Sequence, residues 1–321
     1  MSTRQGTKDL HQHSSPEQLV DALNGVFGNQ QPGVRAVHAK GINLNGFFRA
    51  SNSARTVSKA PHFQNTSIPM AVRFSDFTGF PNIADTDPLA SPRGMSIKFH
   101  LPDGSDTDIV AHSFNGFPVA TADEFRELLI AMASSGPGVT KPTPLDFFLA
   151  THPAAKTFLE SQIPPPASYA TVSYFGVNTF KFSNAEGKVT FGRYQIRPTE
   201  GEESLPLVEA KSAHRDYLRN EIKSRISHGP VRFKLLLQVA EKGDEIDDPS
   251  IAWPDTRIQV ELGTIEITQA VSDNAAAERE LLFLPGVLPA GIEAQDPMIR
   301  ARQEAYPVSY ERRREQEELA A

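Results

Sequence analysis

Cysteine is absent from the 321 residues of this sequence. Its absence excludes disulfide bonds, zinc–thiolate sites, iron–sulfur clusters and a cysteine nucleophile or thiolate ligand, and it leaves the redox compartment open. Long apolar runs are absent too. The N-terminus is polar, and no segment approaches the length of a signal-peptide core or a membrane-spanning helix. We therefore expect a cytoplasmic protein with no membrane partner.

The sequence also has little that would bind nucleotides or nucleic acids. No G-x-G-x-x-G motif follows an expected strand, and neither a P-loop nor a G-x-S-x-G motif is present. A net charge of −7 and a pI near 5.7 argue against a partner with a phosphate backbone. These absences leave NAD, nucleotide and α/β-hydrolase functions without support, and they predict no nucleic-acid partner.

The apolar residues that are present predict a large β-rich core. The sequence is 39% hydrophobic and has 20 phenylalanines. A period of two over residues 70–75 and 95–101 predicts strands. Residues 184–187 lie between two β-like segments and predict a hairpin, and residues 231–241 and 257–267 predict further strands. Because these strands do not alternate regularly with helices, the expected fold class is α+β with an antiparallel sheet or barrel.

Helices are expected where capping signals precede an apolar stripe. Such signals occur at residues 15–18, 121–124 and 143–144. Further helices are expected over residues 212–228 and from residue 296 onward. No internal repeat and no shift in composition marks a second domain. We therefore expect residues 15–321 to form a single domain, preceded by a disordered tail of residues 1–14.

Arg302 and Tyr306 are the first pair of residues that could carry chemistry. At positions i and i+4 of the expected last helix, they share one helix face. Tyrosine binds a metal as its phenolate, and a permanently charged guanidinium nearby favours that anion. A phenolate can serve as an axial ligand to haem iron. The spacing alone has no specificity, so its weight depends on the rest of the chain.

Three further segments contain candidate residues. His38 lies in an apolar, strand-like segment, where a histidine is by default a hydrogen-bonded core residue. Arg73 and Ser75 share one face of the strand over residues 70–75. From the pattern alone that face is solvated, since an inward arginine would need an anion and an inward serine a polar partner. Asn115 precedes Gly116 in a turn after an expected strand.

Taken in order, these segments resemble the haem catalase family. VRAVHAKG resembles its distal-histidine motif, VRFSDF the following strand, and DIVAHSFNGFPVATADEF the segment with the distal asparagine. DFFLATHPAAKTFL and FGVNTFKFSNAEGK resemble its helix-then-hairpin region, and LLFLPGVLPAGIEAQDPMIRARQEAYPVSYERRR the approach to its proximal tyrosine helix. The resemblance is colinear over residues 34–314.

The resemblance implies a catalase-like antiparallel β-barrel with surrounding helices, and a ferric haem b buried between barrel and helices. It implies that Tyr306 is the proximal iron ligand and that Arg302 holds it as phenolate. His38 matches the distal acid–base histidine, and Ser75 matches the serine that hydrogen-bonds to it. Asn115 matches the distal asparagine, although its flanks differ from the family's usual G-N-N-T-P.

The resemblance further implies that arginines pair with the haem propionates and that an apolar residue precedes the distal histidine. The matching arginines are Arg35, Arg73 and Arg313. The residue before the distal histidine is Val37, as in catalases, whereas the coral allene oxide synthases have threonine there. Val37 is therefore expected at the cofactor, and it speaks against an isomerase.

The short chain resembles the branch of catalase-related peroxidases. We expect a haem peroxidase that reduces hydrogen peroxide or organic hydroperoxides with a small organic electron donor, with weak catalase activity. Alternatives are a true catalase, an allene oxide synthase-like hydroperoxide isomerase, a non-catalytic haem-binding protein and a haem-free barrel for an apolar ligand. Family habit implies a homo-oligomer, and the short termini favour a dimer over an interwoven tetramer.

Overall fold

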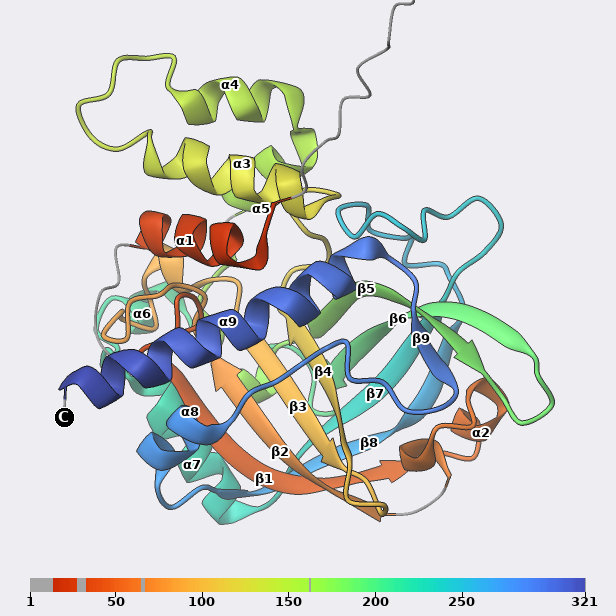
Figure 1. The fold of residues 1–321 in the computed structure, drawn as a ribbon. Coiled ribbons are helices and arrows are strands. Elements are labelled where there is room, and N and C mark those ends of the chain that lie inside the picture. Colours follow the sequence, from red (N-terminus) through yellow and green to blue (C-terminus); the bar gives the residue numbers. More distant parts are fainter. Residues whose placement is uncertain (1–13, 28–32, 65–66, 162, 321) are drawn as a thin grey trace, which may run out of the picture.

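The computed structural model describes residues 14–27, 33–64, 67–161 and 163–320 (Figure 1). The predicted tail, residues 1–14, lies outside these residues except for Ser14, whose backbone N–H donates to Asp123 Oδ1 at 2.6 Å. In the described part of the chain, no helix is long and apolar enough to cross a membrane.

One antiparallel sheet forms the centre of the molecule. Its strands are β1 (Gly41–Ala50), β2 (Ser67–Ser75), β3 (Gly94–His100), β4 (Asp106–His112), β5 (Tyr174–Ser183), β6 (Val189–Pro198), β7 (Val231–Val239), β8 (Gln259–Ala270) and β9 (Ile292–Ala294). The strand order is β4-β3-β2-β1-β8-β7-β6-β5-β9, and β4 also pairs with β5. That pairing, between His112 and Phe175, closes β1 to β8 into a barrel and leaves β9 on the outside of β5.

The side chains of β2 point alternately into the interior of the barrel and to its outer face. Met70, Val72 and Phe74 are buried in the main hydrophobic cluster. Arg73 and Ser75 point to the opposite face, yet they are also buried, with 4% and 3% of their surface exposed. The solvated face expected from the pattern alone is therefore wrong, because helices cover the barrel there.

The helices are α1 (Pro16–Phe27), α2 (Ala54–Val57), α3 (Ala122–Ala133), α4 (Pro144–Thr151), α5 (Pro153–Glu160), α6 (Leu207–Ala210), α7 (Tyr217–His228), α8 (Asn274–Glu280) and α9 (Pro297–Ala320). Of these, α1, α3, α4, α5 and α9 gather over one side of the barrel, whereas α2 and α7 lie away from them (Figure 1). Figure 1 shows α9 running across the barrel strands, with α1 beside it and the α3–α4 pair beyond α1. These helices thus form a layer over the outer face of the barrel.

The ends of several helices follow from local sequence. The capping box of α3 forms as expected, through Thr121 with Glu124, and α4 starts as expected at Thr143-Pro144, where the structure adds a capping box with Asp146. The helix predicted over residues 212–228 begins only at Tyr217. Helix α9 starts as expected after residue 296 and continues through an internal proline.

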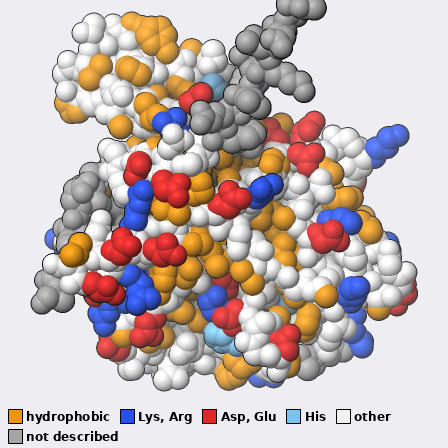
Figure 2. All heavy atoms as spheres, in the orientation of Figure 1, with side chains coloured by type: hydrophobic (Ala, Val, Ile, Leu, Met, Phe, Trp, Pro, Cys, Tyr) orange, Lys and Arg blue, Asp and Glu red, His pale blue; other side chains and the backbone are white. Residues whose placement is uncertain are grey.

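The α3–α4 pair stands out from the rest of the surface. Figure 2 shows hydrophobic side chains on this lobe, whereas acidic and basic side chains intermix over the face below it. Ile130 and Phe147 are exposed on it by 43% and 64%.

Residues 34–40 are not strand-like, contrary to the sequence-based expectation. They form bends, and the strand starts at Gly41. His38 has a φ of 54°, and no other non-glycine residue in the described part of the chain has a positive φ. Histidine is among the residues that tolerate this region best, but the conformation still costs energy that the surroundings must offset. Strand periodicity cannot predict such a bend.

Candidate active site

A cavity of about 260 Å³ lies between the outer face of β2–β4 and helices α1, α3, α5 and α9. Most of its wall is apolar. Its lining contains these sequence-predicted site residues: Arg35, Val37, His38, Arg73, Ser75, Arg302, Tyr306 and Arg313. Residues from both ends of the chain therefore line one cavity.

His38 is held by its backbone and by its ring. Its N–H donates to the Phe77 carbonyl at 2.8 Å, and its carbonyl accepts from Nη2 of Arg73 at 2.7 Å. Its Nδ1 is 3.0 Å from Oγ of Ser75. The Phe77 ring packs against the imidazole edge to face, with 5.5 Å between ring centroids. These contacts fix the imidazole at one end of the cavity.

Gly94 leaves the space in which the His38 ring lies. In the sheet, Ser75 pairs with Gly94, and Gly94 pairs with His112. Residues directly opposite one another project to the same face, so Ser75 and His112 flank the glycine. A Cβ on Gly94 would lie 2.5 Å from Oγ of Ser75 and 2.8 Å from Nδ1 of His38. The bare glycine therefore lets the imidazole approach the sheet.

Burial keeps two histidines of the cavity uncharged. Desolvation, followed by the charge of Arg73, lowers the pKa of His38 to about 3. Desolvation, followed by the charge of Arg302, lowers the pKa of His112 to about 3. Both rings are therefore neutral at pH 7, which leaves each with one N–H donor and one nitrogen acceptor.

Asn115 differs from the expectation. It lies in the bend after β4, and it is not in the lining formed by the described residues, whereas His112 is. The reason is strand register: β4 ends at His112, opposite Gly94, so the chain has already turned away when it reaches Asn115. The structure thus brings a histidine, not this asparagine, beside His38.

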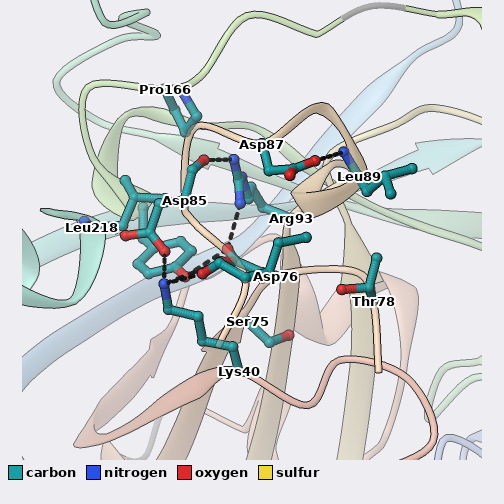
Figure 3. Close-up of polar contacts among 12 residues, drawn as sticks. Lys40, Ser75, Asp76, Thr78, Asp85, Asp87, Leu89, Arg93, Pro166 and Leu218 are labelled. Carbon is teal, nitrogen blue, oxygen red and sulfur yellow. Dashed lines mark hydrogen bonds and ion pairs between the residues drawn. The ribbon is translucent and has the colours of Figure 1, made fainter. Parts of the chain in front are cut away.

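A buried ion cluster holds the two segments that carry His38 and Ser75. Figure 3 shows Asp76 between Lys40 and Arg93, with Asp85 beside Lys40. The hydroxyl of Tyr169 donates to Asp76 at 3.0 Å. Burial and the nearby charge of Asp76 raise the pKa of Asp85 to about 7. Because Lys40 and Asp76 follow His38 and Ser75 closely in the chain, the cluster anchors both.

Arg302 and Tyr306 lie one turn apart on α9 and also line the cavity. Nε and Nη2 of Arg302 donate to the Tyr306 phenol oxygen at 3.0 and 2.8 Å. Nη1 of Arg302 donates to Oδ1 of Asn178 on β5. Asn178 in turn donates to Asp296, with its Nδ2 3.0 Å from Oδ1. Burial raises the pKa of Asp296 despite these donors. The phenol oxygen is thereby fixed from the barrel side.

Arg35 and Arg73 share one carboxylate. Their Nε atoms lie 3.2 Å and 2.8 Å from Glu278 of α8. Burial alone would raise the pKa of Glu278, but the two guanidinium groups lower it to about 2. No sequence motif pointed to Glu278, because α8 is a short helix without one.

Arg313 completes a group of three arginines. It is buried, with 4% exposed, and its Nε and Nη2 have no hydrogen-bond partner in the described part of the chain. Burial and the charge of Arg73 lower its pKa to about 10, so it stays charged at pH 7. The unpartnered Nε and Nη2 of Arg313 could bind a carboxylate that a ligand brings into the cavity.

The residues present fit a haem. An apolar cavity suits the porphyrin, the unpartnered Arg313 donors suit a propionate, and a fixed tyrosine suits the iron. Among the described residues, no group of three or more His, Asp or Glu side chains could hold a metal ion by itself.

Fold and cavity together define a haem-protein architecture, and comparison with known proteins identifies it. The family model described as Catalase matches residues 17–317. The chain belongs to the catalase family. The expected antiparallel barrel with surrounding helices is confirmed, since the crystal structure of a fungal catalase matches with a TM-score of 0.77 at 22% identity, over 98% of this chain and 66% of that chain.

The family resemblance stated from the sequence is confirmed by two relatives of similar length. A protein of Mycolicibacterium paratuberculosis named "Catalase-related peroxidase" is 39% identical over 299 residues, covering 92% of this chain and 93% of the relative. A protein of Synechococcus elongatus with the same name is 35% identical over 305 residues, covering 93% of this chain and 88% of the relative.

Proposed function

We propose that the protein is a haem b-dependent peroxidase. It reduces hydrogen peroxide or an organic hydroperoxide with a small organic electron donor, and it has weak catalase activity. The observation that carries this proposal is that His38, hydrogen-bonded to Ser75, and Tyr306, hydrogen-bonded to Arg302, line one apolar cavity. The two relatives named catalase-related peroxidase support the same reading.

Tyr306 would bind the haem iron, and Arg302 would keep its oxygen anionic with two N–H donors. Arg35, Arg73 and Arg313 would bind the propionates. Val37 would contribute an apolar contact, as its place in the lining allows. When bound, haem supplies an iron centre that accepts oxidising equivalents from a peroxide and passes them to a donor.

His38 moves the proton in this proposal. Because its ring is neutral, one nitrogen can take the proton from one oxygen of the peroxide and deliver it to the other oxygen, which then leaves as water or an alcohol. Ser75 accepts from Nδ1–H when the ring is in that tautomer, which frees Nε2 as the base. The phenyl ring of Phe77 keeps the imidazole from rotating away.

The test begins with haem reconstitution and an absorption spectrum, followed by peroxide with and without guaiacol. We expect tyrosinate-type bands, fast donor oxidation and slow oxygen release. His38→Ala should react with peroxide about 10²–10⁴-fold more slowly while keeping its haem. His100→Ala is the control, because His100 lies exposed on β3, 47% accessible, away from the cavity. Failure to take up haem, or full activity in His38→Ala, contradicts the proposal.

A true catalase is the second candidate, because family membership and the His38–Ser75 pair are equally compatible with it. Vigorous oxygen evolution without a donor would identify it. Turnover of a fatty-acid hydroperoxide without any donor would identify the isomerase, against which Val37 argues. Haem uptake without any reaction with peroxide would identify a non-catalytic haem protein. The dimer stays a prediction, which the mass of the protein in solution tests.

A further inference from the structure

His112 ends β4 in the wall of the cavity, and its ring has a defined tautomer. Its Nδ1 accepts a hydrogen bond from the backbone N–H of Phe114 at 3.3 Å. Because the ring is neutral, an acceptor at Nδ1 requires the proton to be on Nε2. His112 therefore presents an N–H donor from the side of its ring that faces away from the turn.

That donor has no acceptor. Nε2 of His112 is buried and has no hydrogen-bond partner in the described part of the chain. A buried, unsatisfied donor destabilises the fold, so it calls for a physical reason. The neighbouring Phe158 ring, whose centroid lies 6.2 Å from that of the imidazole, has no oxygen or nitrogen that could accept this hydrogen bond.

The position of His112 relative to His38 supplies the reason. Ser75, Gly94 and His112 form one row across three adjacent strands, on the face that lines the cavity. Adjacent strands are about 4.8 Å apart, so Ser75 and His112 stand about 10 Å apart with the His38 ring over the glycine between them. Two neutral imidazoles thus share the same end of the cavity.

We propose that His112 is a second catalytic residue, whose Nε2–H donates a hydrogen bond to the peroxide while His38 transfers the proton. This inference rests on the proposed function. His112 keeps its own proton throughout and polarises the O–O bond. The overall balance is that of the peroxidase reaction: the O–O bond breaks, the organic donor loses two electrons and two protons, and water forms with an alcohol or a second water.

The alternative is that His112 serves only the turn after β4, as the acceptor for Phe114. The two roles need different atoms, Nε2 for peroxide and Nδ1 for the turn. His112→Phe keeps the ring volume but removes both functions. His112→Asn restores an acceptor and an N–H donor with different geometry and volume. A role in chemistry predicts that His112→Phe loses rate and cyanide affinity and that Asn restores both, whereas a role in the turn alone predicts wild-type rate and cyanide affinity in folded His112→Phe.

His62 offers a matched control. His62 is buried, as is Nε2 of His112, and desolvation lowers the pKa of each of the two rings to about 3. It stacks on Phe63 and Phe99 in the barrel interior and is not in the lining of the cavity formed by the described residues. His62→Leu therefore reports the effect of replacing a buried histidine away from the cavity.

The experiment uses the haem-loaded protein, with the rate of its reaction with hydrogen peroxide and its affinity for cyanide as readouts. Cyanide binding probes the distal donor without turnover. We expect His112→Phe to react about 10²-fold more slowly, the scale for losing one preorganised donor, and to bind cyanide at least about tenfold more weakly. His112→Asn should recover most of both, and His62→Leu should stay within about twofold of the wild type.

Wild-type rate and cyanide affinity in His112→Phe would overturn the inference, as would His112→Asn being as slow as His112→Phe. If His112→Phe does not fold, His112→Leu decides by the same criteria. If the wild-type protein does not react with peroxide at all, the proposed function fails first, and that outcome is distinct from a reactive wild type with an equally reactive His112 variant.

Discussion

Arg302 directs two N–H groups at the phenol oxygen of Tyr306, from Nε at 3.0 Å and from Nη2 at 2.8 Å. A third nitrogen of the same guanidinium holds Asn178 on the barrel. The position of the phenol oxygen is therefore set by both the helix and the sheet, rather than by the rotamer of the tyrosine alone.

Replacing Arg302 should weaken the proposed iron ligand. Charge-assisted hydrogen bonds contribute about 1.5–3 kcal/mol, so Arg302→Leu should lower haem affinity about tenfold to a hundredfold and shift the absorption spectrum away from the tyrosinate type. Haem titration of the apoprotein measures this. Arg300→Leu is the control, because Arg300 lies on the same helix with its side chain 85% exposed. An unchanged spectrum in Arg302→Leu would contradict the assignment.

A methyl group at Gly94 should displace His38. The added Cβ would lie 2.5 Å from Oγ of Ser75 and 2.8 Å from Nδ1 of His38, closer than such atoms approach. We expect Gly94→Ala to fold and bind haem, yet to react with peroxide at least about tenfold more slowly, since misplacing a catalytic group is costly. Gly136→Ala is matched, because a Cβ there meets nothing within 4 Å. Equal rates for the two variants would show that the imidazole tolerates the shift.

The reaction with peroxide should show no titration near pH 6.5. The pKa of His38 is lowered to about 3, so its ring stays neutral, and able to accept a proton, down to about pH 4. The same shift acts on stability: a histidine buried neutral stabilises the fold above its unfolded pKa of about 6.5, and that contribution is lost as the pH falls towards 3. A stopped-flow pH profile of the wild type against Ser75→Ala measures the first effect. Loss of half the rate near pH 6.5 would argue against the buried, neutral ring.

Glu278 should make the apoprotein sensitive to acid. Its pKa is lowered from 4.5 to about 2 by Arg73 and Arg35, in spite of burial. A lowered carboxyl pKa stabilises the fold above the unfolded value and loses that stabilisation as the pH falls through the folded value. Between pH 5 and pH 2 this contribution amounts to about 3 kcal/mol. Denaturant unfolding at pH 5 and pH 2 measures this change in the free energy of unfolding. We expect the change to be absent in Glu278→Gln and to be the same as in the wild type in Glu304→Gln, because Glu304 is half exposed on α9.

Local rules predicted those elements that local residues determine. A capping box predicted the start of α3, Thr143-Pro144 predicted the start of α4, and a period of two predicted β2 and β3. The bend that presents His38 escaped these rules, because its positive φ depends on contacts with Phe77 and Arg73. The backbone conformation of His38 therefore follows from tertiary contacts and not from the intrinsic backbone preferences of residues 34–40.

The candidate site shows the same division. Family motifs brought eight of the expected residues to the cavity, but not Asn115. Three participants gave no signal: Glu278 pairs with a residue 243 positions away, Asn178 meets Arg302 from another element, and His112 reaches the cavity through its register with Gly94. Register and long-range ion pairs are properties of the assembled sheet, and a single strand's pattern does not contain them.

The closure of the barrel gives His112 a second significance. In the described strands, β4 and β5 join through the pair His112–Phe175 alone, whereas the other neighbours in the ring share long ladders. In thermal motion such a ring behaves as a curled sheet with two adjacent edges, and its least costly local opening is at this joint. The weakest joint of the barrel and one wall of the cavity therefore share His112, so a ligand that accepts a hydrogen bond from this residue would also tighten the joint.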